Sequence, residues 1–244
     1  MAESVEQLGN GVELLISDNY GFGTDALLLA DFADPHRKDR CLDLGTGCGI
    51  IPMIWYRNGI TADIYGLDIQ SAAIDQFNRS LNRNGNPDNV HAVHADLRNL
   101  PGTLPLGSFR TVTMNPPYKI NGTGILSSSA SDKIARHETE CTLQDICSAA
   151  RRLLNFGGKF CICNRPERLA DVIEAFHKAN IEPKRLRMVQ KRPDTRPWLF
   201  LLEGRLGGKP YLDVQPPFFI QNEAGGDSAE LLRVLGVYRE EDNS

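Results

Sequence analysis

Four short apolar segments, each ending on a polar residue, constrain the fold of this chain most strongly. They read "RCLDLGT", "ADIYGLDI", "NVHAVHADL" and "FRTVTMN", and their length and composition are typical of strands. Helical patterns follow the first two of them, from Ile50 to Asn58 and from Ser71 to Asn84. Strands that alternate with helices favour a parallel sheet covered by helices on both faces.

The second half of the chain continues the alternation. The pattern predicts a helix from Leu143 to Asn155, a fifth strand at "GKFCICN", and a helix opened by Pro166, because proline fits the first turn of a helix. Two more strands are expected near Arg185–Gln190 and Trp198–Glu203. The predicted fold class is therefore α/β: a Rossmann-like, seven-stranded, mostly parallel sheet with helices on both faces. Such sheets bind ligands where their strands end, so the polar residues that end the strands should converge on one edge.

Composition and charge point to an ordinary globular protein. Of the 244 residues, 41% are hydrophobic, and no run approaches the roughly 20 apolar residues that span a bilayer. The N-terminus has no apolar segment typical of a signal peptide, so we expect a cytoplasmic protein without a membrane partner. The six cysteines include no C-x-x-C pair, so reduced thiols and no bound metal are expected. Nothing in the sequence predicts an oligomeric state.

A glycine-rich turn follows the first predicted strand. The segment "DLGTGCGI" runs from Asp43 to Ile50 with the spacing G-x-G-x-G. Ile50 occupies the position where the dinucleotide-binding fingerprint has its last glycine. This departure disfavours NAD and favours an adenosyl ligand that lacks a pyrophosphate.

Polar residues end the next three predicted strands. Asp68 can accept hydrogen bonds from the two hydroxyls of a ribose, and Asp96 can accept one from an adenine amine while Leu97 packs beside the ring. Asn115 ends the fourth strand. Taken alone, Asp68 or Asp96 fits a helix N-cap or a turn residue better than a ligand-binding residue. Four consecutive strands that end in this way favour a ligand site.

The glycine turn, Asp68, Asp96 and the motif "NPPY", in this order, resemble the class I S-adenosylmethionine-dependent methyltransferases over roughly Asn19 to Glu203. Within that class, [DNS]-PP-[YFW] marks the branch that methylates planar nitrogens. The resemblance implies the class I methyltransferase fold and S-adenosylmethionine as the cofactor. It also implies a set of cofactor-binding residues, namely Asp43, Gly45, Thr46, Gly47, Gly49, Asp68, Ile69, Asp96, Leu97 and Asn115.

The upstream segment "DNYGFGTDALLLADF" resembles the opening of the bacterial tRNA1(Val) adenine-N6 methyltransferase family. In that family the segment caps the methionine end of the cofactor, which implicates Phe22, Thr24 and Asp25. From the residues alone, the same segment also fits an amphipathic helix capped by Thr24 or Asp25, with the leucines at 27–29 in the core.

We expect one structural domain with three regions. Residues 1–35 form an N-terminal cofactor-capping segment, 36–206 the methyltransferase domain, and 207–244 a C-terminal extension that resembles the family more loosely.

The "NPPY" motif explains why a buried strand stops on an amide. An exocyclic amine is a poor nucleophile because its lone pair is delocalised into the ring. Two acceptors on its hydrogens, the Asn115 side-chain oxygen and the Pro116 carbonyl, favour the tetrahedral geometry needed for attack. The two prolines, Pro116 and Pro117, hold these acceptors stiffly, and Tyr118 offers a ring on which a base can stack. We therefore predict that Asn115, Pro116, Pro117 and Tyr118 are catalytic, with positioning supplying most of the rate.

Several planar amines remain candidate substrates. Glutamine methyltransferases of release-factor proteins share the motif but usually carry a separate helical N-terminal domain, and duplex DNA enzymes usually need a large target-recognition domain. RNA loops already expose their bases, so an RNA base, in tRNA or rRNA, fits better than duplex DNA. The family resemblance then implies the adenosine 3′ of the anticodon in a valine tRNA. A catalytically silent adenosyl- and RNA-binding module is the alternative from another class, and the intact "NPPY" argues against it.

A local excess of basic residues predicts RNA contacts, although the same segment also fits an ordinary solvated face. Between Lys184 and Lys209 there are eight Lys and Arg residues against two acids, although the whole chain has a formal net charge of −4. Arginines at 151, 152, 165 and 168 are further candidates for phosphate contacts. The residues predicted to bind the substrate are Tyr118, Lys119, His137, Arg192 and Arg196.

Overall fold

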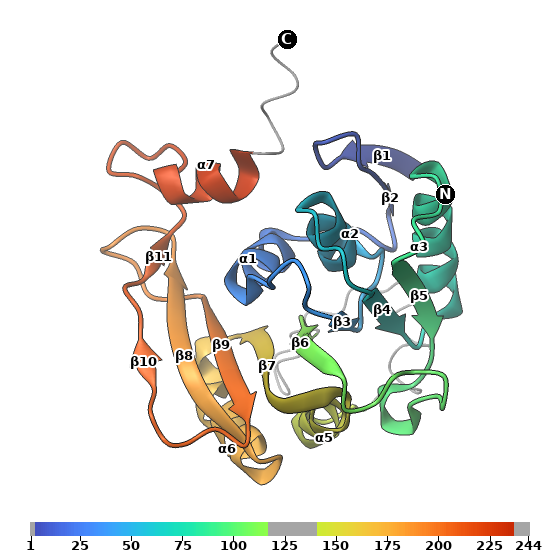
Figure 1. Cartoon of the computed structure of the whole chain (residues 1–244). Coiled ribbons are helices and arrows are strands. Elements are labelled where there is room, and N and C mark those ends of the chain that lie inside the picture. Colours follow the sequence, from blue (N-terminus) through green and yellow to red (C-terminus); the bar gives the residue numbers. More distant parts are fainter. Residues whose placement is uncertain (1–2, 117–140, 237–244) are drawn as a thin grey trace.

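The computed structural model describes residues 3–116 and 141–236 of the chain. A single large sheet dominates it (Figure 1). Its seven long strands are β3 (Cys41–Leu44), β4 (Ile64–Asp68), β5 (Val90–His94), β6 (Phe109–Met114), β7 (Leu154–Asn164), β8 (Ile181–Gln190) and β9 (Leu199–Leu206). They lie side by side in the order β8-β9-β7-β6-β3-β4-β5. The predicted α/β class with a mostly parallel sheet is confirmed.

The order of the strands indicates where a ligand binds. β9 runs antiparallel to both of its neighbours, whereas β5, β4, β3, β6 and β7 pair in parallel. The chain moves from β3 outward to β5 and then returns to the other side of β3 as β6. This reversal between β3 and β6 is the topological switch point at which open α/β sheets bind their ligands.

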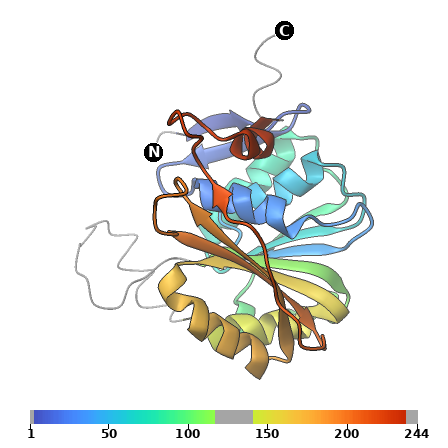
Figure 2. The ribbon, with the colours of Figure 1, turned by 90° about the vertical axis from the view of Figure 1, so that its left-hand side faces the viewer.

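Helices cover both faces of the sheet (Figure 2). One hydrophobic cluster contains residues of α1 (Thr24–Ala33), α2 (Ile50–Arg57) and α3 (Ser71–Arg83). The other contains residues of α5 (Leu143–Leu153) and α6 (Leu169–Lys178). Successive strand residues point to opposite faces, so both faces of a strand such as β7 are apolar. This explains why the strands appear in the sequence as continuous apolar runs. Two short 3-10 helices, η1 (Leu97–Asn99) and η2 (Pro166–Arg168), complete the central part.

An antiparallel hairpin of β1 (Glu3–Gln7) and β2 (Glu13–Ser17) precedes the sheet and packs beside α3. Polar contacts hold it there. Arg79 forms an ion pair with Glu3, and the backbone N–H of Leu15 donates to Ser80 Oγ over 3.0 Å. Leu14 and Ile16 of β2 also reach the apolar cluster of this face, but an alternation of two residues is too short to indicate a strand by itself.

The C-terminal residues extend the sheet. The two-residue strands β10 (Asp213–Val214) and β11 (Phe218–Phe219) both pair in parallel with β8, so the described part of the sheet has nine strands rather than seven. The helix α7 (Ala229–Gly236) then packs against α1. In the described part of the chain, no helix is long and apolar enough to cross a membrane.

Candidate functional site

Polar residues meet at the carboxyl edge of the sheet, as the sequence predicted. Register fixes this convergence, because Leu44 lies opposite both Leu67 and Met114, which immediately precede Asp68 and Asn115. We divide the edge into two parts. The β3–β5 half comprises the residues that follow β3, β4 and β5, and the β6–β9 half comprises those that follow β6 and β7 together with the hairpin 191–198 between β8 and β9.

The glycine turn lies tightly against α3. Gly49 has a φ of 87°, and a Cβ there would come within 2.2 Å of the Phe77 ring, so only glycine lets α2 begin at this point. Gly47 also has a positive φ, of 56°, but a Cβ on it would meet no atom within 4 Å. The turn therefore presents open backbone to the site at Gly47. The Thr46 hydroxyl beside it is buried and makes no well-formed hydrogen bond to the described residues.

Asp68 ties the glycine turn to the end of β4. Its Oδ2 accepts a hydrogen bond from the Gly47 N–H and its Oδ1 accepts one from the Gln70 N–H, each over 2.9 Å. The residue is only 5% exposed, and burial raises its pKa despite these hydrogen bonds. Each carboxylate oxygen can accept a second hydrogen bond, so the group is held in place and still able to bind two hydroxyls.

Asp43 is buried more deeply than expected for a residue that contacts a cofactor at the surface. It is 2% exposed, and its Oδ1 accepts a hydrogen bond from Thr113 Oγ1 over 2.7 Å, which joins β3 to β6. Burial raises the pKa of Asp43 to about 7, while Thr113 and the adjacent Thr46 act in the opposite direction. The described contacts of Asp43 stabilise the sheet beneath the glycine turn, and a cofactor contact remains a prediction.

Asp96 forms local contacts of the kind that the turn interpretation expected. It caps η1 by accepting from the Arg98 N–H and also forms a two-point ion pair with the Arg98 guanidinium. The hydrogen bonds from Arg98 lower the pKa of Asp96, so the group is a carboxylate at neutral pH. Leu97 is buried beside it, and the Ile69 carbonyl approaches His94 Nε2 at 2.9 Å. These residues lie together at the end of β5, where the sequence predicted an adenine site.

The segment before α1 lies beside the glycine turn. The Tyr20 hydroxyl donates to Gln70 Oε1 over 3.2 Å, and the Cys48 thiol approaches the Gly21 carbonyl at 3.8 Å. Phe22 packs against the apolar cluster of this face. The N-cap of α1 is Gly23, which makes no side-chain capping bond, so the expected cap by Thr24 or Asp25 is wrong. Thr24, the first residue of the helix, is exposed, and Asp25 is half-buried.

Asn115 follows β6 at the switch point and is half-buried, and Pro116 beyond it is buried. The Cys163 thiol of β7 donates to Asn115 Oδ1 over 3.1 Å. Four predicted site residues, Pro117, Tyr118, Lys119 and His137, lie outside the described residues.

The basic segment between Lys184 and Lys209 does not form one surface. It folds into the antiparallel pair β8 and β9, so its two ends, Lys184 and Lys209, lie together at one edge of the sheet, whereas the hairpin 191–198 lies at the opposite, carboxyl edge. Arg185 and Arg205 form ion pairs with Glu203, and Arg187 forms one with Glu230. The segment therefore does not form a single phosphate-contact surface, and RNA contacts by Arg192 and Arg196 of the hairpin stay a prediction.

The hairpin 191–198 keeps part of that segment at the carboxyl edge. Arg192 and Arg196 are exposed there, and Arg192 forms an ion pair with Asp194. Arg165, which directly follows β7, donates to the Trp198 carbonyl over 3.0 Å and lies over the Trp198 ring at 5.6 Å. The β6–β9 half thus combines cationic and aromatic side chains.

Two other predicted phosphate contacts lie at the wrong edge. Arg151 and Arg152 end α5, which leads into the start of β7. Because β7 has 11 residues, its two ends lie roughly 30 Å apart, and Asn115 is beside the far one.

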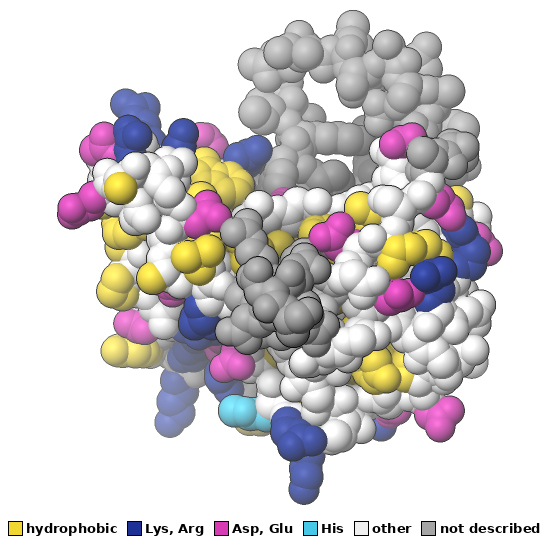
Figure 3. All heavy atoms as spheres, turned by 90° about the horizontal axis from the view of Figure 1, so that it is seen from above, with side chains coloured by type: hydrophobic (Ala, Val, Ile, Leu, Met, Phe, Trp, Pro, Cys, Tyr) yellow, Lys and Arg dark blue, Asp and Glu magenta, His cyan; other side chains and the backbone are white. Residues whose placement is uncertain are grey.

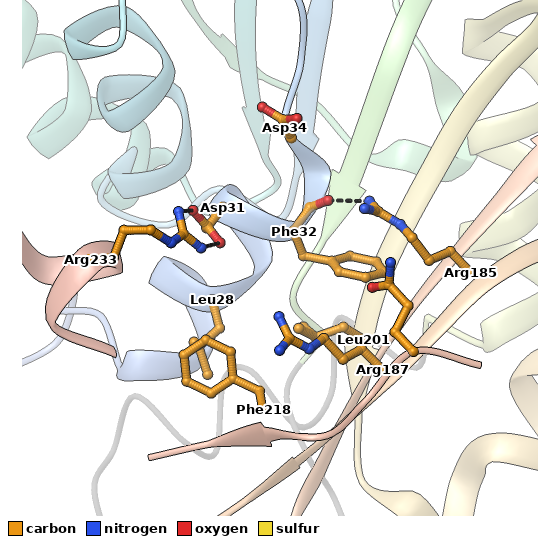
Figure 4. A pocket seen from close by; sticks show the side chains of 10 residues that line it. Leu28, Asp31, Phe32, Asp34, Arg185, Arg187, Leu201, Phe218 and Arg233 are labelled. Carbon is orange, nitrogen blue, oxygen red and sulfur yellow. Dashed lines mark hydrogen bonds and ion pairs between the residues drawn. The ribbon is translucent and has the colours of Figure 1, made fainter. Parts of the chain in front are cut away.

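A cavity of about 310 Å³ opens elsewhere, between α1, β8 and the C-terminal residues (Figure 4). Three arginines, Arg185, Arg187 and Arg233, line it, and each forms an ion pair with a carboxylate, Arg233 with Asp31 of α1. The Arg187–Glu230 and Arg233–Asp31 pairs join the C-terminal residues to the body of the protein, whereas Arg185–Glu203 lies between β8 and β9. On the face formed by the α1, α2 and α7 layer, described basic and acidic side chains are interspersed (Figure 3). The described residues contain no cluster of three or more His, Cys, Asp or Glu side chains suited to a metal ion.

A family model described as methyltransferase small domain matches residues 17–183, well over half of the chain. The chain belongs to this family. It is a methyltransferase, and S-adenosylmethionine is its methyl donor. The open backbone at Gly47, the buried Thr46 hydroxyl and the preformed Asp68 carboxylate fit that cofactor.

Known relatives agree with this assignment. A tRNA1(Val) (adenine(37)-N6)-methyltransferase from Parabacteroides distasonis is 26% identical over 181 residues, which cover 74% of this chain and 75% of the relative. An enzyme of the same name from a Flavobacteriaceae bacterium is 26% identical over 178 residues, covering 67% and 74%. Among solved structures, a predicted O-methyltransferase from Agrobacterium tumefaciens superposes with a TM-score of 0.70 at 20% identity, covering 88% of this chain and 96% of that one. Geranyl diphosphate methyltransferase in complex with S-adenosylmethionine gives a TM-score of 0.56 at 13% identity, covering 75% and 84%. The structural likenesses establish the class I methyltransferase fold.

Sequence reasoning missed Thr113, Arg98 and Cys163. Thr113 and Cys163 lie in strands and reach the site residues from a neighbouring strand, so only the register reveals them. Arg98 follows Asp96 by two residues, a spacing at which an ion pair was foreseeable.

Proposed function

We propose that this methyltransferase acts on the exocyclic N6 amine of an adenosine in tRNA, next to the anticodon of a valine tRNA. The observation that supports this most directly is the position of Asn115. It is a half-buried amide at the switch point, one residue beyond the strand that pairs with β3 and its glycine turn. The names of the relatives from Parabacteroides distasonis and the Flavobacteriaceae bacterium support the choice of tRNA and of adenine.

The β3–β5 half would hold the cofactor. Asp68 would accept the ribose hydroxyls, Asp96 the adenine amine, and Leu97 and Ile69 would contact the adenine ring. The Gly45–Gly49 turn and Thr46 would lie along the adenosyl group, above Asp43, with Phe22, Thr24 and Asp25 at the methionine end. S-adenosylmethionine supplies an electrophilic methyl group on sulfur.

The β6–β9 half would hold the base. Asn115 Oδ1 and the Pro116 carbonyl would accept the two amine hydrogens, which orients the nitrogen lone pair and stabilises positive charge on the amine. Tyr118 would stack on the base, a contact worth roughly 1–3 kcal/mol. Lys119, His137, Arg192 and Arg196 would contact the RNA around it. No general base is required, because the methylated amine loses its proton readily to water.

Radiolabelled methyl transfer tests the substrate. The protein is incubated with labelled S-adenosylmethionine and either total unmodified bacterial tRNA or a release-factor protein, and the products are digested and separated. We expect label in N6-methyladenosine from tRNA. Label in the release factor, or none in RNA, would overturn the proposed substrate and leave the methyltransferase assignment intact.

A further inference from the structure

One cysteine of β7, Cys163, contacts the residue that follows β6, Asn115. Cys163 is completely buried, and its thiol donates to Asn115 Oδ1 over 3.1 Å. The parallel register of the two strands creates this contact, since Met114 lies opposite Ile162 and each chain then advances by one residue. A thiol is thus held against the same oxygen that the proposed function assigns to the substrate amine.

An amide side chain has two ends of nearly equal shape and opposite function. Its oxygen accepts hydrogen bonds and its nitrogen donates them, so a rotated Asn115 would present N–H groups to the amine hydrogens and repel them. The Cys163 thiol donates to the oxygen, whereas its sulfur is a poor acceptor for an amide N–H, so the contact favours the orientation with the oxygen against the thiol. The amide oxygen has two acceptor sites, and the thiol takes one of them.

We propose that Cys163 is a positioning residue that fixes the amide orientation of Asn115, so that its oxygen faces the substrate amine. This inference rests on the proposed role of Asn115 as an acceptor. The thiol is a weak donor, so it orients the oxygen while leaving its second acceptor site nearly as strong as before. A hydroxyl in the same place would orient the amide too, but it would draw more electron density from the oxygen and reach less far.

The chain offers a matched control in Cys161. It lies two residues earlier on β7, is equally buried, and belongs to the same apolar cluster, so its side chain points to the same face. Replacing either cysteine with alanine removes one sulfur atom from the same apolar cluster. A purely structural role predicts similar losses of stability and activity for the two variants.

The kinetic test compares Cys163→Ala, Cys163→Ser and Cys161→Ala in methyl transfer to tRNA. We expect Cys163→Ala to lower kcat about tenfold, the size of one modest hydrogen bond, with the KM for S-adenosylmethionine unchanged. Cys163→Ser should recover part of the loss, and Cys161→Ala should stay within twofold of the unmodified protein. A kcat for Cys163→Ala equal to that of Cys161→Ala would overturn the proposal.

A second readout needs no substrate. The S–H stretching band of Cys163, isolated by subtracting the infrared spectrum of Cys163→Ala from that of the unmodified protein, reports the strength of its hydrogen bond. We expect this band to move to higher frequency in an Asn115→Ala background, and an unchanged band would refute the contact. If the unmodified protein transfers no methyl group to tRNA, the proposed function fails, and the infrared result alone decides whether Cys163 holds Asn115.

Discussion

In the β3–β5 half of the carboxyl edge, the Asp68 carboxylate is buried and accepts hydrogen bonds from two backbone N–H groups. In the β6–β9 half, the Arg192 guanidinium is exposed and pairs with Asp194, two residues away. A buried charge held by backbone groups keeps one geometry, whereas an exposed pair can exchange its partner for a phosphate at little cost. The first half is preorganised for a small ligand of fixed shape, and the second suits a large, charged ligand.

Asn115 stands at the boundary between the halves, and its removal should give the largest effect. Asn115→Ala deletes one of the two proposed acceptors for the amine, and removing one such preorganised group from an active site typically costs about 100- to 1,000-fold in kcat. Binding of S-adenosylmethionine, measured by calorimetry, should stay within a fewfold of the unmodified protein. Near-normal turnover would show that the β6–β9 half does not act through this amide.

Asp68→Ala should affect the other half. The change removes the proposed ribose contact and leaves the N–H groups of Gly47 and Gln70 without their acceptor. We expect the Kd for S-adenosylmethionine to rise about 10- to 100-fold, since hydrogen bonds to charged groups are worth roughly 1.5–3 kcal/mol.

Asp96→Ala is the matched control for Asp68→Ala. Its carboxylate is more exposed and already paired with Arg98, so the expected rise in Kd is smaller. Equal losses for the two variants would contradict a difference in preorganisation between the end of β4 and the end of β5.

The pH dependence of stability tests the burial of charge beneath the glycine turn. Burial raises the pKa of Asp43 from 3.8 to about 7, so between these values the folded state binds more protons than the unfolded state. The stability associated with Asp43 is therefore greatest below pH 3.8 and is lost as the pH rises through about 7. Asp43→Asn keeps an acceptor for Thr113 and removes the buried charge.

We expect Asp43→Asn to have a higher Tm than the unmodified protein at pH 8, by about 5 °C, in scans without cofactor. The difference should shrink toward zero at pH 4, where the folded protein already holds Asp43 protonated. A difference that stays constant from pH 4 to pH 8 would contradict a raised pKa at this position.

The two halves also differ in how far the sequence predicted them. Asp68 and Asn115 were predictable because each follows an apolar run that had to be a strand, and parallel strands end at a common edge. Arg185 and Arg187 belong to a basic run whose charge gave no sign of their acidic partners, which come from β9 and α7. Cys163 touches Asn115 only because of the register between β6 and β7, which no local pattern specifies. The β1–β2 hairpin was missed as well, since only Leu14 and Ile16 of its strands reach the apolar cluster and polar side chains of α3 supply further contacts.

The smallest expected effect concerns the exposed cations of the β6–β9 half. If Arg192 contacts a phosphate, Arg192→Ala should weaken tRNA binding by only a fewfold at moderate salt. It should also reduce the slope of log Kd against log salt by slightly less than one, because one fewer counterion is released. Arg196→Ala should behave in the same way.

Arg151→Ala provides the control, because this exposed arginine lies at the opposite edge of the sheet. It should leave both the affinity and the salt slope unchanged. A salt slope that responds equally to Arg151→Ala and Arg192→Ala would mean that RNA binding follows overall charge rather than position. The proposed role of the hairpin 191–198 in RNA binding would then fail, while the proposed cofactor site would be unaffected.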